Sequence, residues 1–173
     1  MNYRYSICYP DKPKPEWFEN SISEAQVKNM FNSYPFEEEL KKPDEGNFAP
    51  SLEFQNLTDS YRIIFSAFLE NQKIWFQVTL LIPPNRPIEK FNDELFYKEC
   101  DEIHSNFNQQ DSLGILDLFL ESKYKAIKQL MAERMIIPSK NNIIETKTSS
   151  DKSLLKKPNF IIREPKSWWE FWK

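Results

Sequence analysis

Apolar and polar residues alternate at the start of the chain and then follow the spacing of a helix. Every second residue from Tyr3 to Tyr9 is aromatic or aliphatic, which predicts a β-strand that ends at the following proline. Residues 21–24 (Ser-Ile-Ser-Glu) have the form of a capping box, and apolar residues continue at helical spacing to Tyr34. A second, short helical turn is predicted over residues 36–41, with three glutamates on its exposed side.

Three runs rich in large apolar residues follow in the middle of the chain, over residues 51–57, 61–69 and 73–82. The polar breaks between these runs are short enough only for antiparallel hairpins. The third run is almost continuously apolar, so we expect it to be a central strand that is covered on both faces.

The remainder of the folded part is predicted to be helical. Asn92 is a suitable N-cap for one helix, which includes Phe107. Asp111 or Ser112 is a suitable cap for a second helix, which runs to Ile137. The resulting order, β-α-β-β-β-α-α, predicts an α+β fold in which an antiparallel sheet of about four strands carries helices on one face.

Composition divides the chain into three parts. Residues 1–138 form the expected single α+β domain, residues 139–157 have the polar composition of a linker, and residues 158–173 form an aromatic tail. The tail either docks on its own domain, fills a groove of a partner, or contacts a membrane interface, and the sequence leaves these three alternatives open. The residues expected to dock are Trp168, Trp169, Phe171 and Trp172.

Scarce residue types limit the chemistry. The chain has two glycines, whereas phosphate-binding loops need several. Its single histidine, His104, argues against a catalytic triad or a multi-histidine metal site. Two cysteines in a chain of this length are typical of reduced thiols, and we expect neither a secretion signal nor a membrane span. The sequence therefore predicts a cytoplasmic protein that requires no metal and no nucleotide cofactor.

Cys100 and His104 are the remaining candidates for chemistry, because their spacing places both on one side of the predicted helix. With Cys8 nearby they would supply three zinc ligands, but a fourth ligand is missing. A cysteine nucleophile with a histidine base would lack an orienting group and oxyanion donors in any evident motif. A buried thiol and a structural histidine explain the pair better, so we expect no catalytic residue and no enzyme.

Charge is divided unevenly along the chain. Residues 139–173 contain eight basic and four acidic residues, a net charge of +4, whereas residues 1–138 contain 15 basic and 22 acidic residues, a net charge of −7. An acidic body disfavours nucleic acid and suits a basic protein partner, although a soluble surface alone also explains it. Two acidic patches are candidates for the partner surface: Glu37, Glu38, Glu39, Asp44 and Glu45, and, in the helix after Asn92, Asp93, Glu94, Asp101 and Glu102.

Four short stretches resemble small bacterial immunity proteins, which neutralise the toxins of polymorphic toxin systems. The resemblance is one of size and style, and it carries over no functional residue. The stretches are residues 8–13 (Cys-Tyr-Pro-Asp-Lys-Pro), 34–40 (Tyr-Pro-Phe-Glu-Glu-Glu-Leu), 49–54 (Ala-Pro-Ser-Leu-Glu-Phe) and 168–173 (Trp-Trp-Glu-Phe-Trp-Lys).

These observations favour a non-enzymatic protein-binding protein. The resemblance implies a cytoplasmic bacterial immunity protein, which would occlude a toxin through an acidic surface. The alternative is a membrane-peripheral or scaffold protein that docks through its Trp-rich tail.

Overall fold

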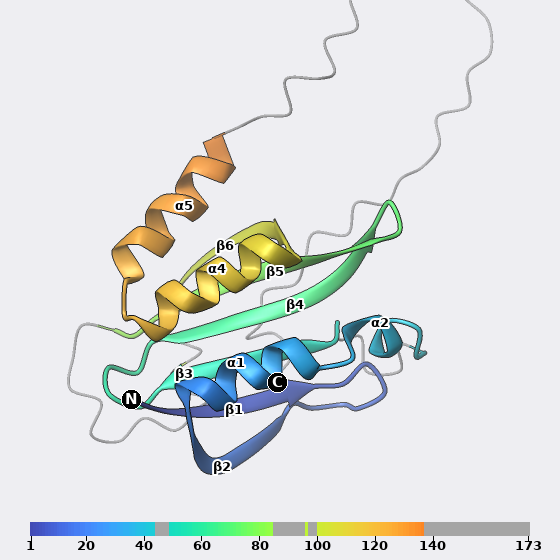
Figure 1. The fold of residues 1–173 in the computed structure, drawn as a ribbon, viewed down its shortest axis with the longest axis horizontal. Helices are drawn as coiled ribbons and strands as arrows, with labels where there is room; N and C mark the ends of the chain where they lie inside the picture. Colours follow the sequence, from blue (N-terminus) through green and yellow to red (C-terminus); the bar gives the residue numbers. More distant parts are fainter. Residues whose placement is uncertain (44–48, 85–95, 97–99, 137–173) are drawn as a thin grey trace, which may run out of the picture.

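All neighbouring strands of the sheet are antiparallel, and the sheet has six of them. The computed structural model describes residues 1–43, 49–84, 96 and 100–136 (Figure 1). The strands are β1 (Asn2–Cys8), β2 (Glu16–Ser23), β3 (Ser51–Asn56), β4 (Arg62–Glu70), β5 (Lys73–Ile82) and β6 (Asp101–Asn108), and the helices are α1 (Glu24–Ser33), α2 (Phe36–Glu39), α4 (Gln109–Leu120) and α5 (Tyr124–Ile136). Their order across the sheet is β2-β1-β3-β4-β5-β6.

The four helices pack on the same face of the sheet and enclose the main core (Figure 1). Alternate strand residues point to this face because side chains in a strand have a period of two. Each large apolar side chain buried there stabilises the fold by about 1.5–3 kcal/mol. The helices contribute Val27, Phe31, Phe36, Ile115, Leu116, Phe119, Leu120, Ile127 and Met131 to this core.

The predicted α+β class, the first strand and the three strands in the middle of the chain are confirmed. β5 pairs with β4 and β6, and its later residues are buried on both faces as expected, but it lies next to the edge strand β6 rather than at the centre. The turn between β4 and β5 has positive φ at Asn71 (50°) and Gln72 (62°). Two central residues in this conformation match the twist of a tight hairpin.

The predicted number of strands is too low because β2 and β6 are also strands. In β2 only Ile22 is buried, so the strand has no regular apolar alternation. Its two aromatic residues are adjacent and therefore point to opposite faces. Phe18 stacks on Tyr5 at a ring-centroid distance of 4.6 Å, whereas Trp17 pairs with Ser6. An edge strand of this kind gives a weak sequence signal.

Residues 101–108 form β6, so the helix predicted after Asn92 is wrong over this stretch. Ile103 and Phe107 are four residues apart, a spacing that fits one side of a helix and one face of a strand equally well. In the sheet they lie opposite Leu80 and Phe76 of β5. Pairing with an existing apolar strand decided between the two structures.

Ser23, and not Ser21, caps α1. The Ser23 hydroxyl accepts a hydrogen bond from the Gln26 backbone N–H at 3.4 Å, and the Gln26 side-chain oxygen accepts one from the Ser23 N–H at 2.9 Å. Glutamine can take the place of glutamate in a capping box. Ser23 and Gln26 therefore form the box, two residues later than the box predicted at Ser21 and Glu24. Val27 and Phe31 are buried, in agreement with the predicted apolar side.

The long helix predicted to end at Ile137 is two helices. Asn108 caps α4, since its side-chain oxygen accepts from the Asp111 N–H at 2.9 Å. α4 ends at Leu120, and Ser122, two residues later, has a left-handed φ of 54°. The N–H of Lys123 donates to the carbonyl of Leu118 at 2.8 Å, which completes a helix-ending motif normally built on glycine. The periodicity hid this break because both helices face the same core.

The other face of the sheet buries an ion pair. Glu53 of β3 and Arg62 of β4 lie 3.3 Å apart, and their side chains are only 2% and 3% exposed. The Ser6 hydroxyl donates to Glu53 at 3.2 Å, and the Arg62 guanidinium lies 3.9 Å from the ring centroid of Phe96. Trp17 lies 5.2 Å from the same guanidinium. Aromatic rings and a carboxylate thus surround a cation that is removed from water.

Replacing Glu53 by alanine is expected to lower the free energy of unfolding by about 3–5 kcal/mol, because it leaves a buried guanidinium without this carboxylate. Glu16→Ala is the matched control, since it breaks the exposed pair with Lys12 and should cost less than about 1 kcal/mol. Urea unfolding at neutral pH measures both values. Equal losses in the two variants would show that the buried pair does not constrain the fold.

Candidate functional site

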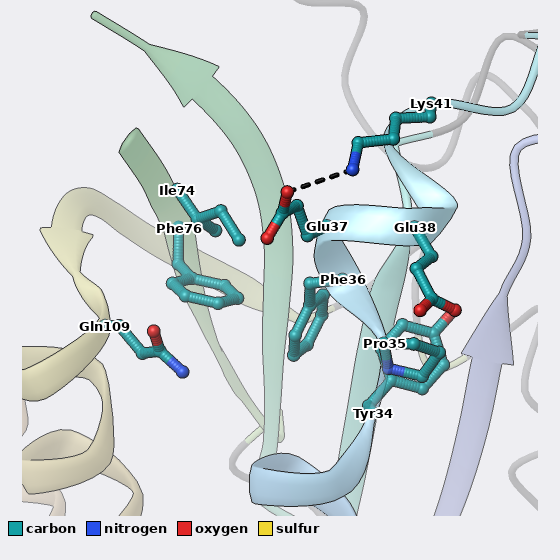
Figure 2. Close-up of a pocket in the computed structure, with 9 residues that line it drawn as sticks. All are labelled: Tyr34, Pro35, Phe36, Glu37, Glu38, Lys41, Ile74, Phe76 and Gln109. Carbon is teal, nitrogen blue, oxygen red and sulfur yellow. Dashed lines mark hydrogen bonds and ion pairs between the residues drawn. The ribbon is translucent and has the colours of Figure 1, made fainter. Parts of the chain in front are cut away.

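A recess lies between α2, the start of β5 and the start of α4 (Figure 2). Its volume is about 370 Å³. Its aromatic and aliphatic side chains form the inner wall, and two glutamates and a lysine stand beside them (Figure 2). We call it the acidic recess, and its lining residues are Tyr34, Pro35, Phe36, Glu37, Glu38, Lys41, Ile74, Phe76 and Gln109.

Phe36 holds α2 against the sheet. α1 ends at Ser33 and is followed by Tyr34, which has extended backbone, and Pro35 is the N-cap residue of the short helix. The Phe36 ring is 4% exposed and lies 4.8 Å from Phe76 and 5.7 Å from Phe31, measured between ring centroids. A four-residue helix has little stability of its own, so this aromatic packing fixes its position.

The inward position of Phe36 directs Glu37 and Glu38 outward, because successive helix residues are about 100° apart. Glu37 is 70% exposed and pairs with Lys41 at 2.9 Å. Such an exposed pair contributes only about 0.3–0.5 kcal/mol, so a cation from a partner can replace Lys41 at little cost. Glu38 makes no ion pair within the described part of the chain.

Glu39 does not belong to this exposed surface, contrary to the prediction. It is 6% exposed, and its carboxylate accepts from the Lys42 ammonium at 2.7 Å. Its position three residues after Phe36 returns it to the buried side of α2. Asp44 and Glu45, the other members of the first predicted patch, lie outside the described residues.

The described residues of the second predicted patch lie on a strand and not on the predicted helix. Asp101 and Glu102 are strand residues of β6 and pair with Ile82 and Leu81 at the end of β5. The acidic recess uses the start of β5, and six residues of strand between Phe76 and Ile82 span about 20 Å. The described residues of the two patches therefore lie apart along β5. Asp93 and Glu94 lie outside the described residues, as do the docking residues of the tail, Trp168, Trp169, Phe171 and Trp172.

Tyr34 adds a polar group to the wall of the acidic recess. Its hydroxyl is buried and has no hydrogen-bond partner within the described residues. Burial raises the pKa of Tyr34, and the nearby negative charge of Glu39 raises it further. The hydroxyl therefore stays protonated at neutral pH, and it is buried behind the surface that carries Glu37 and Glu38.

The two cysteines are protonated at neutral pH. Burial, followed by the charge of Glu53, raises the pKa of Cys8 to about 12, and burial and Glu102 do the same for Cys100. A thiol is a poor nucleophile compared with a thiolate. His104 is on β6, so the helical spacing predicted for Cys100 and His104 does not exist.

Over the ranges that the structure describes, no group of three or more His, Cys, Asp and Glu side chains is placed to hold a metal ion. No described helix is long and apolar enough to cross a membrane.

Sequence reasoning found the two exposed glutamates of the recess but not its inner wall. Ile74 and Phe76 belong to β5 and Gln109 to α4, so only the fold brings them beside α2. Phe36 carries a usable signal, because an aromatic residue just after Pro35 and before three glutamates is the natural anchor of a short amphipathic turn.

Cys100 is expected to react with iodoacetamide at pH 7.5 on the order of a thousandfold more slowly than a free cysteine, because its pKa is raised to about 12 from about 8.5. Its rate should rise about tenfold for each pH unit above pH 8.5, where a free thiol levels off. Mass spectrometry of the labelled peptides measures the rate, and the same protein in urea is the control. Native labelling at the rate of the unfolded chain would contradict a raised pKa.

The chain matches no protein-family model, no curated protein and no solved structure. The shape and charge of the acidic recess are therefore the grounds for assigning a function.

Proposed function

We propose that the protein is a non-enzymatic, cytoplasmic protein-binding protein that neutralises a bacterial toxin by covering its basic substrate-binding cleft. The acidic recess carries this proposal. Glu37 and Glu38 stand outside a wall of Phe36, Phe76 and Ile74, so charge and apolar surface occur together.

A lysine or arginine side chain of a partner fits this arrangement. Its aliphatic stem would pack on Pro35 and the partly exposed Ile74, which line the recess in front of the buried Phe36 and Phe76, while its charged end would reach Glu37 or Glu38. Basic side chains anchored in pockets are frequent energetic centres of protein interfaces, so the recess is suited to hold one such anchor.

The charge of the body supports a basic partner. Residues 1–138 have seven more acidic than basic residues (22 against 15). Opposite net charges accelerate association and orient the encounter. Proteins that act on nucleic acid have basic clefts, and blocking such a cleft stops the activity without any chemistry by the inhibitor. The resemblance of residues 34–40, which contain α2, to immunity proteins points to the same class.

The recess is an anchor and not the whole interface. A stable complex buries about 800 Å² on each partner, which is more than one side chain covers. Exposed residues on either side of the recess, Asn32 and Ser33 in the last turn of α1 and Lys42 and Pro43 after α2, are available to extend the contact.

Charge reversal at the recess tests this proposal. The candidate partner to test is the product of the gene immediately upstream, and growth of bacteria that express both proteins reports neutralisation. Glu37→Lys combined with Glu38→Lys is expected to slow association about tenfold or more, because it replaces local attraction by repulsion. Stopped-flow or surface-binding kinetics at low and high salt measure the rate constants.

The matched control reverses two exposed carboxylates on other elements, Glu19 of β2 and Glu133 of α5. Glu19→Lys with Glu133→Lys changes the net charge by the same amount, so it corrects for general steering. Equal slowing in both double variants would place the interface away from α2. If the product of the upstream gene does not inhibit growth when expressed alone, the proposal that the partner is a toxin is wrong.

A further inference from the structure

A second pocket lies at the opposite end of α4 from the acidic recess. Gln109, the first residue of α4, lines the recess, whereas the second pocket begins just after the last residue of α4. Its volume is about 500 Å³. We call it the lysine pocket, and its main lining residues are Tyr61, Ser122, Lys123, Tyr124, Lys125 and Lys128.

The aromatic part of the lysine pocket is held in place. The rings of Tyr61 and Tyr124 are stacked, with centroids 3.8 Å apart and an angle of 6° between their planes. The Tyr124 hydroxyl donates to Asp59 at 2.7 Å, and Asp59 also accepts from the Tyr61 N–H at 3.2 Å. One carboxylate thus fixes both tyrosines, so the pocket has a rigid wall before any ligand arrives.

The cations of the lysine pocket are in an unfavourable position. Lys123, Lys125 and Lys128 surround the N-terminus of α5, where the helix dipole is positive and acidic residues are preferred. The first turn of α5 contains no acidic residue. Lys123 pairs with Glu121 at 2.6 Å, but Lys125 and Lys128 make no ion pair with any described residue. Folding therefore brings three ammonium groups close to the N-terminus of α5, and two of them, those of Lys125 and Lys128, have no described counterion.

We propose that the lysine pocket binds the phosphate group of a small phosphorylated molecule. A phosphate would neutralise Lys125 and Lys128 and would accept hydrogen bonds from their ammonium groups. The N–H groups of Tyr124 and Lys125, in the first turn of α5, bond to no described acceptor and would be available to the same phosphate. The tyrosine wall would pack against the organic part of the ligand.

The charge of the rest of the molecule favours a small ligand over nucleic acid. A phosphate backbone that continued beyond the pocket would meet an acidic body, which repels it. This site is separate from the acidic recess and does not depend on the proposed role in toxin neutralisation.

Phenyl phosphate and inorganic phosphate are the probes, added to the full chain at an ionic strength matched with sodium chloride. A ligand that binds only the folded state raises the melting temperature. Both probes are therefore expected to raise it above the value in chloride, and phenyl phosphate more so because of the tyrosines. Amide chemical-shift changes should be largest over residues 122–128.

Lys125→Ala combined with Lys128→Ala should abolish both effects, whereas Lys14→Ala with Lys73→Ala, which removes two exposed lysines elsewhere, should retain them. In chloride alone Lys125→Ala should melt no lower than the original chain, because it relieves repulsion at the helix N-terminus. Lys128 is left in place for this comparison, because its ammonium lies 5.7 Å from the ring centroid of Tyr61. A lower melting temperature in chloride would overturn the unfavourable placement on which the proposal rests.

Equal melting temperatures of the original chain in phosphate and chloride would also overturn the proposal. The proposed ligand would be nucleic acid and not a small molecule if a single-stranded oligonucleotide bound in a lysine-dependent manner while phenyl phosphate did not bind.

Discussion

The packing of Phe36 on Phe76 and Phe31 is the contact on which the acidic recess depends. α2 has four residues and no side-chain cap, so it has no means of stabilising itself. Its place is set by one ring inserted between α1 and the sheet, at 4.8 Å from Phe76. The same insertion decides which glutamates are exposed. Glu37 and Glu38 face solvent and Glu39 is buried because Phe36 fixes the rotation of the helix.

α4 connects two sites of opposite charge. Its first residue lines the acidic recess, and the lysine pocket follows its last turn. Twelve residues of helix span about 18 Å, a distance over which salt at physiological strength screens most of the attraction between the two ends. The sites can therefore bind oppositely charged partners independently, although both rest on the same buried face of α4, which packs on β5 and β6.

Local signals were sufficient where neighbouring residues decide the structure. The strands in the middle of the chain and the apolar side of α1 follow from alternation and helical spacing, and both were predicted. The errors occurred where two structures fit the same pattern. Ile103 and Phe107 satisfy a helix and a strand, and only the partner strand β5 selects β6. Ser122 follows α4 in a left-handed conformation that serine rarely adopts, so no residue type in the sequence indicates the end of this helix.

The candidate site was half predictable for a related reason. Exposed carboxylates are visible in a sequence as a run of charge, but the side of the helix on which each one falls depends on the anchor residue. The wall of the recess is even harder to predict from the sequence. Phe36, Phe76 and Gln109 are separated by at least 33 residues of chain and come together only in the folded structure. The lysine pocket shows the same limit, since Tyr61 and Tyr124 stack across 63 residues. A charge pattern therefore indicates the sign of a partner, whereas the shape that would select the partner is a property of the fold.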